Sequence, residues 1–250
     1  MDDSQAASGL ILEALAPGIY AAGGDQALLR PWVGILVTPA GTLLVDSGNG
    51  PLHAADLQAA LERLQAPPVT HILLTHHHWD HVFGSAYFPT AHVVAHVQSD
   101  HHLQIMAGEP WSYDYVLAKA GTYALGRRVA ALMDGAIADW NGFSVRPADE
   151  TFTGTYRLTL GGFTVEMTHV GGQHEPDQCI VHVQPGNVLF LGDATYGRGG
   201  SERWDMAALG AELLAFADRG AEWYVEGHRP PARAARFRQR ARRVARFGTR

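Results

Sequence analysis

Short apolar runs bounded by turn residues fill the first part of the chain and predict β-strands. Residues 18–21, 33–37 and 42–46 are such runs, and Pro39-Ala40-Gly41 provides the turn before the third. Together they predict an antiparallel and largely buried beginning of the fold. Residues 1–15 carry only weak signals.

The pattern then changes to a helical period. Residues 52–65 repeat leucine at helical spacing, and Pro67-Pro68 ends the helix. The apolar residues 71–74 form the next strand, so that strand, helix and strand predict two parallel strands joined by a crossover helix. Residues 83–88 predict a short helix and residues 93–95 a further buried strand.

The middle of the chain, residues 97–150, has a different character. Residues 98–106 and 113–140 carry helical signals and several aromatic residues, but no spacing typical of metal ligands. We interpret this segment as a helical insertion packed over the functional site, a candidate substrate lid. Ordinary packing of helices on the outside of the sheet explains the same pattern, and the two interpretations are compatible.

Strand signals return after residue 151, in two pairs. The first pair meets at Gly161-Gly162 and the second at Pro185-Gly186-Asn187, both of which favour turns. The predicted strands are 156–160, 163–168, 180–183, 188–191 and 223–225, and the predicted helices are 206–216 and 233–247. This order favours an α/β fold, with two packed sheets and helices outside, in a single domain spanning 1–250.

Composition narrows the class of protein. A chain of 250 residues with 46% hydrophobic content can bury the core of one domain, and a net charge of −6 gives no general reason to expect nucleic acid. The single cysteine, Cys179, excludes an internal disulfide and favours a reducing compartment. Neither a secretory signal nor an apolar run long enough to span a membrane is apparent. We therefore expect a soluble, cytoplasmic protein.

The last segment is strongly basic. Nine of the 19 lysines and arginines follow residue 228, where there is no acidic residue. Such a tail could contact nucleic acid or an acidic partner. However, Phe237, Ala241 and Val244 fall at i, i+4 and i+7, which predicts a basic C-terminal helix over 230–250 docked by one face. Its arginines would then form a solvated face, and we expect no nucleic-acid partner.

The strand at 71–74 runs directly into the pattern H-x-H-x-D-H, formed by His76, His78, Asp80 and His81. Imidazole and carboxylate groups suit a borderline divalent ion such as zinc. If the extended backbone persists, His76 and His78 point the same way. Asp80 and His81 lie just beyond, where the chain must turn, and can reach a second ion. The motif therefore predicts a metal site.

Three later residues also follow predicted strands. His174 lies in a glycine-rich loop, Asp193 ends an apolar strand in Leu191-Gly192-Asp193, and His228 follows a strand in Glu226-Gly227-His228. Strand ends on one rim of a sheet converge on a common site, which is where such a fold places chemistry.

Each of these positions also has a purely structural interpretation. His174 alone could be an ordinary loop histidine, Asp193 could cap a turn, and His228 could be a surface residue. The nine other histidines are expected to pack or to face solvent, and we assign His169 a structural role.

The full series of motifs resembles the metallo-β-lactamase superfamily over residues 33–228. This resemblance implies a four-layered αβ/βα sandwich of two mixed sheets flanked by helices, with a binuclear metal site at one edge. It also implies that Asp193 bridges the two ions and that Asp46 supports the histidine loop from behind. The implied ligands are His76, His78 and His174 for the first ion and Asp80, His81 and His228 for the second.

Two details bear on the subfamily. The loop reads Gly172-Gln173-His174-Glu175-Pro176-Asp177 instead of the P-G-H-[ST]-P-G that is frequent in the family, so it matches no one subfamily closely. The complete ligand set, with Cys179 outside it, looks more like the lactonase, glyoxalase II and phosphodiesterase branches than the zinc β-lactamases. The sequence from Asp193 to Tyr196 resembles the D-x-x-Y of quorum-quenching lactonases, where the tyrosine lies by the substrate carbonyl. Packing is the other interpretation of Tyr196.

The resemblance implies a metal-dependent hydrolase of a small-molecule substrate. Two divalent ions, zinc first with manganese or iron as alternatives, would hold a bridging hydroxide that attacks an ester, lactone, thioester or amide. Asp80 would pass a proton to the leaving group, and Tyr196 would assist at the carbonyl oxygen. Alternatives are an iron-dependent oxidoreductase resembling persulfide dioxygenases, and β-lactamase-like or phosphodiesterase activity. A homodimer is compatible with the sequence.

Overall fold

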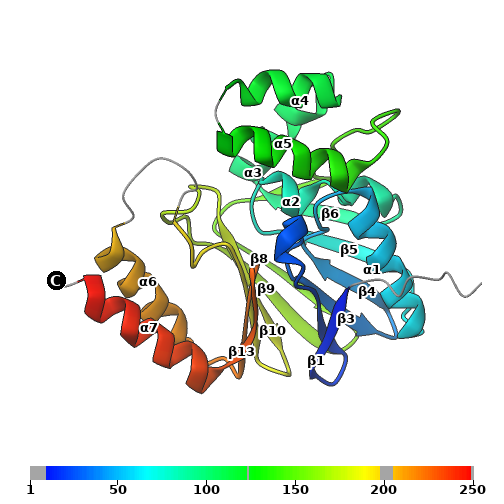
Figure 1. Cartoon of the computed structure of the whole chain (residues 1–250). Helices are drawn as coiled ribbons and strands as arrows, with labels where there is room; N and C mark the ends of the chain where they lie inside the picture. Colours follow the sequence, from blue (N-terminus) through cyan, green and yellow to red (C-terminus); the bar gives the residue numbers. More distant parts are fainter. Residues whose placement is uncertain (1–9, 123, 198–204, 249–250) are drawn as a thin grey trace, which may run out of the picture.

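Two β-sheets packed face to face form the centre of the molecule (Figure 1). The structure is a computed structural model, which describes residues 10–122, 124–197 and 205–248. Helices cover both outer faces, so the layers run helix, sheet, sheet, helix. This arrangement confirms the predicted four-layered α/β sandwich.

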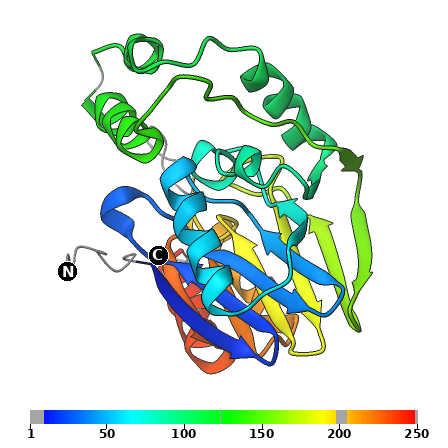
Figure 2. The ribbon, with the colours of Figure 1, turned by 90° about the vertical axis from the view of Figure 1, so that its right-hand side faces the viewer.

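The first sheet has the strand order β1-β2-β3-β4-β5-β6-β7. Its first four strands pair antiparallel, and β4 to β7 pair parallel. The sequence predicted the antiparallel opening strands and the parallel pair β4 and β5 on either side of the crossover helix. The strands are β1 Ile11–Ala16, β2 Ile19–Gly23, β3 Val33–Thr38, β4 Gly41–Val45, β5 Val69–Leu74, β6 His92–His96 and β7 Glu150–Phe152. The crossover helix α1, Pro51–Arg63, lies across the outer face of this sheet (Figure 2).

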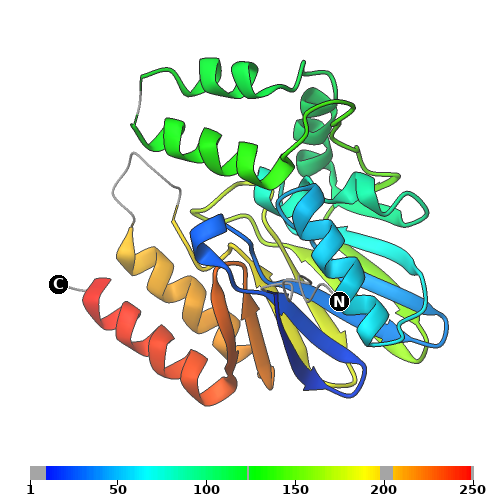
Figure 3. The same cartoon turned by 45° about the vertical axis from the view of Figure 1, so that its right-hand side comes forward.

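The second sheet has the order β13-β12-β11-β10-β9-β8. Strands β8 to β11 pair antiparallel through the two predicted hairpins, and β11 pairs parallel with β12 across helix α6. The strands are β8 Thr155–Leu160, β9 Phe163–His169, β10 Cys179–Gln184, β11 Val188–Gly192, β12 Trp223–Glu226 and β13 Arg229–Arg233. Helices α6, Met206–Asp218, and α7, Ala234–Gly248, lie side by side on its outer face (Figure 3).

The apolar core between the sheets is tightly packed. Val45, Leu73 and Val181 are buried there at 3% exposure or less. At Gly34 the sheets approach so closely that a Cβ atom would lie 2.5 Å from the ring of Phe190, so only glycine fits at that position. The close packing holds the ends of β4, β5, β10 and β11 in one rigid frame.

The insertion contains three helices, α3 Val97–Ala107, α4 Tyr113–Ala120 and α5 Ala124–Ile137. The predicted continuous helix over 113–140 is therefore wrong, since α4 and α5 are separate helices and Trp140 lies beyond α5. Val116 and Met133 are buried in the same core as α1, which supports ordinary packing on the first sheet. The insertion also lies at the end of the sandwich where β5 meets α2, Trp79–Val82 (Figure 1). Its movement as a lid stays a prediction.

Three strands, β1, β7 and β13, were not predicted, and each lies at the edge of a sheet. An edge strand has a hydrogen-bonded neighbour on one side only, and it tolerates proline. Its sequence can therefore lack the continuous apolar run of a central strand. The strand β13 contains Pro230 and Pro231. The short helix predicted at 83–88 is also displaced, because α2 begins at Trp79 inside the histidine motif and a 3-10 turn, Ser85–Tyr87, follows.

The C-terminal helix docks as predicted by its apolar face, but its predicted start at residue 230 is wrong, because residues 229–233 form β13 and the helix begins at Ala234. The ring of Phe237 stacks on Tyr224 with centroids 4.1 Å apart, and Phe237 and Ala241 are almost completely buried. Among the helices of the described residues, none combines the length and apolar character needed to cross a membrane.

Candidate metal centre

The histidine motif begins where β5 ends. The chain bends at Thr75 and His76, directly after β5, and His78 has extended backbone angles (φ −60°, ψ 140°) as the residue that precedes α2. His76 and His78 nevertheless bring a ligand atom each to a common point, and Asp80 and His81 lie on the first turn of α2. The turn that the sequence required after His78 is thus a short helix.

The first group of candidate ligands contains His76, His78, His174 and Asp193, with one ligand atom of each lying within 4.8 Å of the others. Nε2 of His174 lies 3.0 Å from Nδ1 of His78 and 3.4 Å from Oδ2 of Asp193. His174 comes from the loop after β9, and Asp193 from the end of β11. Residues separated by about a hundred positions therefore meet at one point.

The second group contains Asp80, His81 and His228, again with ligand atoms within 4.8 Å. Nε2 of His228 lies 3.1 Å from Oδ2 of Asp80. Asp193 contacts this group too: its Oδ1 lies 3.5 Å from Nε2 of His81 and its Oδ2 lies 3.4 Å from Nε2 of His228. All seven residues singled out in the sequence are therefore brought together, with Asp193 between the two groups.

Electrostatics at this site favour a bound cation. Burial alone would lower the pKa of His81, but the carboxylates of Asp193, Asp46 and Asp80 outweigh it and hold that pKa well above its usual value. Burial likewise opposes charge on His228, yet hydrogen bonds to Asp193 and Asp80 raise its pKa to about 9. The carboxylates thus draw positive charge into a buried site, and a divalent cation would supply that charge more fully than protons do.

Hydrogen bonding tests whether the residues fit a metal. Nε2 of His76, Nε2 of His81 and Oδ1 of Asp193 are buried and have no hydrogen-bond partner. Buried polar atoms are normally paired, and unpaired ones that converge on one point call for an ion or a ligand. Burial lowers the pKa of His76 well below its usual value, which keeps the imidazole neutral and its lone pair available. The donor set therefore fits a divalent metal.

Gly227 shows how tightly the site is enclosed. A Cβ atom at this position would lie 2.1 Å from Oδ1 of Asp193 and 2.9 Å from Cε1 of His81. Only a residue without a side chain allows the chain after β12 to pass this close to both groups.

A layer of polar residues orients the candidate ligands. Asp46 accepts hydrogen bonds from the backbone N–H and the hydroxyl of Thr75, and its Oδ2 lies 2.7 Å from Nδ1 of His81. This is the supporting position that the family resemblance implied for Asp46. Thr75 in turn contacts Nδ1 of His76 at 3.1 Å, which leaves Nε2 of His76 facing the site.

Two acidic residues of the loop that carries His174 contact the histidine motif from outside the two ligand groups. Oε1 of Glu175 lies 3.3 Å from Nε2 of His78, while His174 contacts the other ring nitrogen. Asp177 accepts a hydrogen bond from the backbone N–H of His77 at 2.9 Å and lies 3.0 Å from its Nδ1. The sequence analysis missed both residues. The sequence feature that could have identified them is their position in the His174 loop, where the sequence differs from the pattern that is frequent in the family.

Tyr196 lies beside the second group. Its hydroxyl oxygen accepts a hydrogen bond from the backbone N–H of His228 at 3.1 Å, and the guanidinium of Arg229 lies 4.7 Å from its ring centroid. Burial raises the pKa of Tyr196, so the phenol keeps its proton. The hydroxyl is thus neutral, held in place and able to donate.

The histidine assigned a structural role has structural contacts. His169 stacks on His96 with ring centroids 3.8 Å apart, and its Nε2 lies 2.8 Å from the carbonyl oxygen of Pro176. It therefore helps to hold the loop that carries His174.

Comparison with known proteins agrees with this geometry. A family model described as "Metallo-beta-lactamase superfamily" matches residues 28–229, which contain every candidate ligand. None of the curated proteins compared with the chain matches it.

Solved structures with the same architecture are distant in sequence. A metallo-beta-lactamase from Pontibacter korlensis has a TM-score of 0.62 at 16% identity, covering 94% of this chain and 98% of the other. A metallo-beta-lactamase family protein from Thermus thermophilus has a TM-score of 0.65 at 22% identity, with coverages of 94% and 81%. The sec-alkyl sulfatase PisA1, in a mutant form, has a TM-score of 0.67 at 17% identity, with coverages of 96% and 42%. At these identities the similarities show the shared fold alone.

Proposed function

The chain belongs to the metallo-beta-lactamase superfamily, and from this premise we propose that it is a metal-dependent hydrolase of a small molecule. The observation that carries the proposal is the position of Asp193, whose two carboxylate oxygens lie within 3.5 Å of histidines from both ligand groups. A carboxylate placed in this way suits the bridging of two ions. We assign His76, His78, His174 and Asp193 to one ion and Asp80, His81, His228 and Asp193 to the other.

When bound, such a pair of divalent ions supplies Lewis acidity and activates water near neutral pH. The ligand set contains only imidazole and carboxylate groups, which suits zinc and also manganese or iron. Cys179 takes no part, because it is buried in the core between the sheets.

Two side chains are assigned roles in proton transfer. Asp80 lies at the edge of the second group, with Oδ2 3.1 Å from Nε2 of His228, and we assign it the transfer of a proton to the leaving atom. Tyr196 accepts a hydrogen bond from the backbone of His228, which leaves its own proton to donate to the substrate carbonyl oxygen. The role of Asp80 requires an oxygen, nitrogen or sulfur leaving atom, and the role of Tyr196 requires a carbonyl. Together they favour esters, lactones, thioesters and amides as the proposed substrates.

The fold alone does not select among these substrates. The structural neighbours include proteins titled as metallo-beta-lactamases and one titled as a sec-alkyl sulfatase. We place lactones and thioesters first, because the ligand set resembles the lactonase and glyoxalase II branches and Tyr196 follows the D-x-x-Y pattern.

An assay of hydrolysis before and after chelation tests the proposal. Ester, lactone, thioester and β-lactam substrates are offered to the wild-type protein and to Asp80→Asn and Tyr196→Phe. We expect chelator-sensitive hydrolysis of at least one class, a large loss in Asp80→Asn, and a loss of about 10- to 100-fold in Tyr196→Phe. Activity that survives chelation would overturn the proposal. A single bound iron with no hydrolysis would favour the oxidoreductase alternative.

A further inference from the structure

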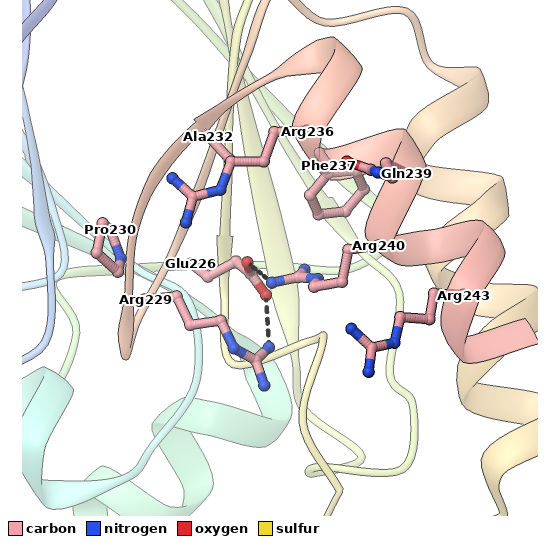
Figure 4. A pocket seen from close by; sticks show the side chains of 9 residues that line it. All are labelled: Glu226, Arg229, Pro230, Ala232, Arg236, Phe237, Gln239, Arg240 and Arg243. Carbon is pink, nitrogen blue, oxygen red and sulfur yellow. Dashed lines mark hydrogen bonds and ion pairs between the residues drawn. The ribbon is translucent and has the colours of Figure 1, made fainter. Parts of the chain in front are cut away.

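A cavity of about 440 Å³ lies between β13 and α7, on the outer side of the second sheet (Figure 4). Four of the nine described residues that line it are arginines, and Glu226 is the one acid among them. The arginines are Arg229, Arg236, Arg240 and Arg243. The cavity therefore concentrates positive charge in a concave site.

Helix geometry explains how three of these arginines reach the cavity. Arg236, Arg240 and Arg243 occupy positions i, i+4 and i+7 of α7, so they share one side of the helix. Arg229 comes from the start of β13 and faces them across the cavity (Figure 4). Like charges at this spacing destabilise a helix, and the described part of α7 has no acidic residue to offset them. A bound anion would relieve this repulsion.

The one carboxylate on the cavity wall is already paired. Glu226 is only 1% exposed, lies 3.2 Å from Nη1 of Arg229, and contacts Nη1 of Arg240 and the hydroxyl of Thr195. Its single negative charge is therefore shared between two guanidinium groups. The described lining residues carry four positive charges against this one negative charge.

Arg240 has donors left over. Its Nε and Nη2 atoms are buried and have no hydrogen-bond partner, while only Nη1 contacts Glu226. Buried guanidinium donors without an acceptor are costly and rare in folded proteins. A small rotation of the guanidinium would allow an acceptor on a bound ligand to satisfy these donors.

We propose that this cavity binds a small phosphate-bearing molecule through Arg229, Arg236, Arg240 and Arg243. Guanidinium groups bind phosphate oxygens in a bidentate manner, and a phosphate monoester or pyrophosphate carries the multiple negative charge that several arginines require. A cavity of about 440 Å³ suits a compact ligand. This inference does not depend on the proposed hydrolase activity.

The cavity is separate from the candidate metal centre but shares supporting residues with it. Arg229 follows His228 in the chain and lies over the ring of Tyr196, and Glu226 contacts Thr195, two residues after Asp193. A ligand that draws Arg229 away from Tyr196 would therefore act on the two segments that carry the candidate ligands Asp193 and His228.

Calorimetric titration of the metal-loaded protein with inorganic pyrophosphate tests the proposal. The variant Arg236→Gln/Arg243→Gln removes two cavity arginines without touching Glu226, and Arg242→Gln removes an exposed arginine of the same helix that does not line the cavity. We expect saturable binding to the wild type, a loss of about tenfold or more in the double variant, and less than about twofold loss in Arg242→Gln.

Further arms separate the sources of such binding. Titration of a His78→Ala variant reports any pyrophosphate bound at the metal centre. Binding that is lost in His78→Ala but retained in the double arginine variant would overturn the proposal. Equal affinities in Arg242→Gln and the double variant, or no saturable binding, would overturn it as well. If citrate binds as tightly as pyrophosphate, the assignment of a phosphate ligand is contradicted. If single-stranded DNA binds more tightly through the same arginines, the small-molecule proposal is overturned in favour of a nucleic-acid ligand.

Discussion

The carboxylate of Asp46 lies 2.7 Å from Nδ1 of His81, although the two residues are 35 positions apart in the chain. Asp46 is the first residue after β4, is only 2% exposed, and has a left-handed backbone (φ 65°) that is unusual for a residue other than glycine. Such a conformation persists only where its surroundings hold it, here by the two hydrogen bonds from Thr75. Asp46 thus links the end of one strand to a candidate ligand delivered by the next.

Replacing Asp46 by alanine is predicted to weaken the second ligand group. His81 would lose the partner that fixes its ring, and metal affinity should fall about 10- to 100-fold. The free energy of unfolding should also fall by about 2 kcal/mol, since buried donors of Thr75 and His81 lose their acceptor. Chelator competition and urea unfolding measure the two effects. Asp56→Ala, which removes a carboxylate paired with Arg30 outside the site, is the control and should leave metal affinity unchanged.

Replacing Gly227 by alanine is predicted to disrupt the site while keeping the fold. The new methyl group would lie 2.1 Å from Oδ1 of Asp193, so the carboxylate must move out of its position between the two groups. We expect metal affinity to fall on the order of 100-fold, measured by chelator competition, with an unchanged circular dichroism spectrum. Gly135→Ala in α5, where nothing lies within 4 Å of the added methyl group, is the matched control. Similar metal affinities in the two variants would contradict the geometry described here.

Glu175 is predicted to orient His78 toward the site. Its carboxylate lies 3.3 Å from Nε2 of His78, and the glutamine variant keeps the shape but loses the charge that favours this ring orientation. Metal affinity of Glu175→Gln should fall about tenfold. Glu166→Gln, which alters an exposed pair with Arg157 on the second sheet, serves as control. A change in Glu175→Gln no larger than in this control would remove the assigned role.

That the candidate ligands meet at one site could be predicted from the sequence, because each follows an apolar strand and the series of motifs resembles a known family. His76, Asp193 and His228 follow strands that are paired on both sides, so hydrophobicity marked their ends. The supporting contacts could not be predicted, since Glu175 meets His78 across 97 positions and Gly227 acts by lacking a side chain. The edge strand β13 was missed because Pro230 and Pro231, which an edge strand tolerates, interrupt its apolar signal.

The basic C-terminal helix shows a different limit. Spacing correctly predicted that Phe237 and Ala241 face the core, and it left the arginines as a solvated face. Whether such arginines face open solvent or a cavity depends on the strand packed opposite, and β13 was among the elements that the sequence did not reveal. A helical period identifies which residues share a side, but it does not identify what lies across from them.

Stability is predicted to fall in acid because of His53. This residue is completely buried, and burial, followed by the charge of Arg30, lowers its pKa to about 3 from 6.5. The neutral ring must gain a proton on unfolding below pH 6.5, so its contribution is fully present above 6.5 and is lost progressively as the pH falls toward 3. Between pH 6.5 and about pH 5 the loss should be about 2 kcal/mol.

Urea unfolding of chelator-treated protein over this pH range, in the wild type and in His53→Gln, isolates that contribution. The variant should show a slope of unfolding free energy against pH that is smaller by about 1.4 kcal/mol per pH unit. Parallel slopes would show that His53 does not take up the proton.

The number of metal ions bound per chain tests the central claim most directly. Wild-type protein dialysed against zinc should retain about two ions per chain, and His174→Ala and His228→Ala, one from each ligand group, should each retain about one. Elemental analysis after gel filtration gives the count, and circular dichroism shows that the variants fold. A wild-type chain that retains no divalent metal, or variants that retain as much as the wild type, would contradict the assignment of these residues as a binuclear metal centre.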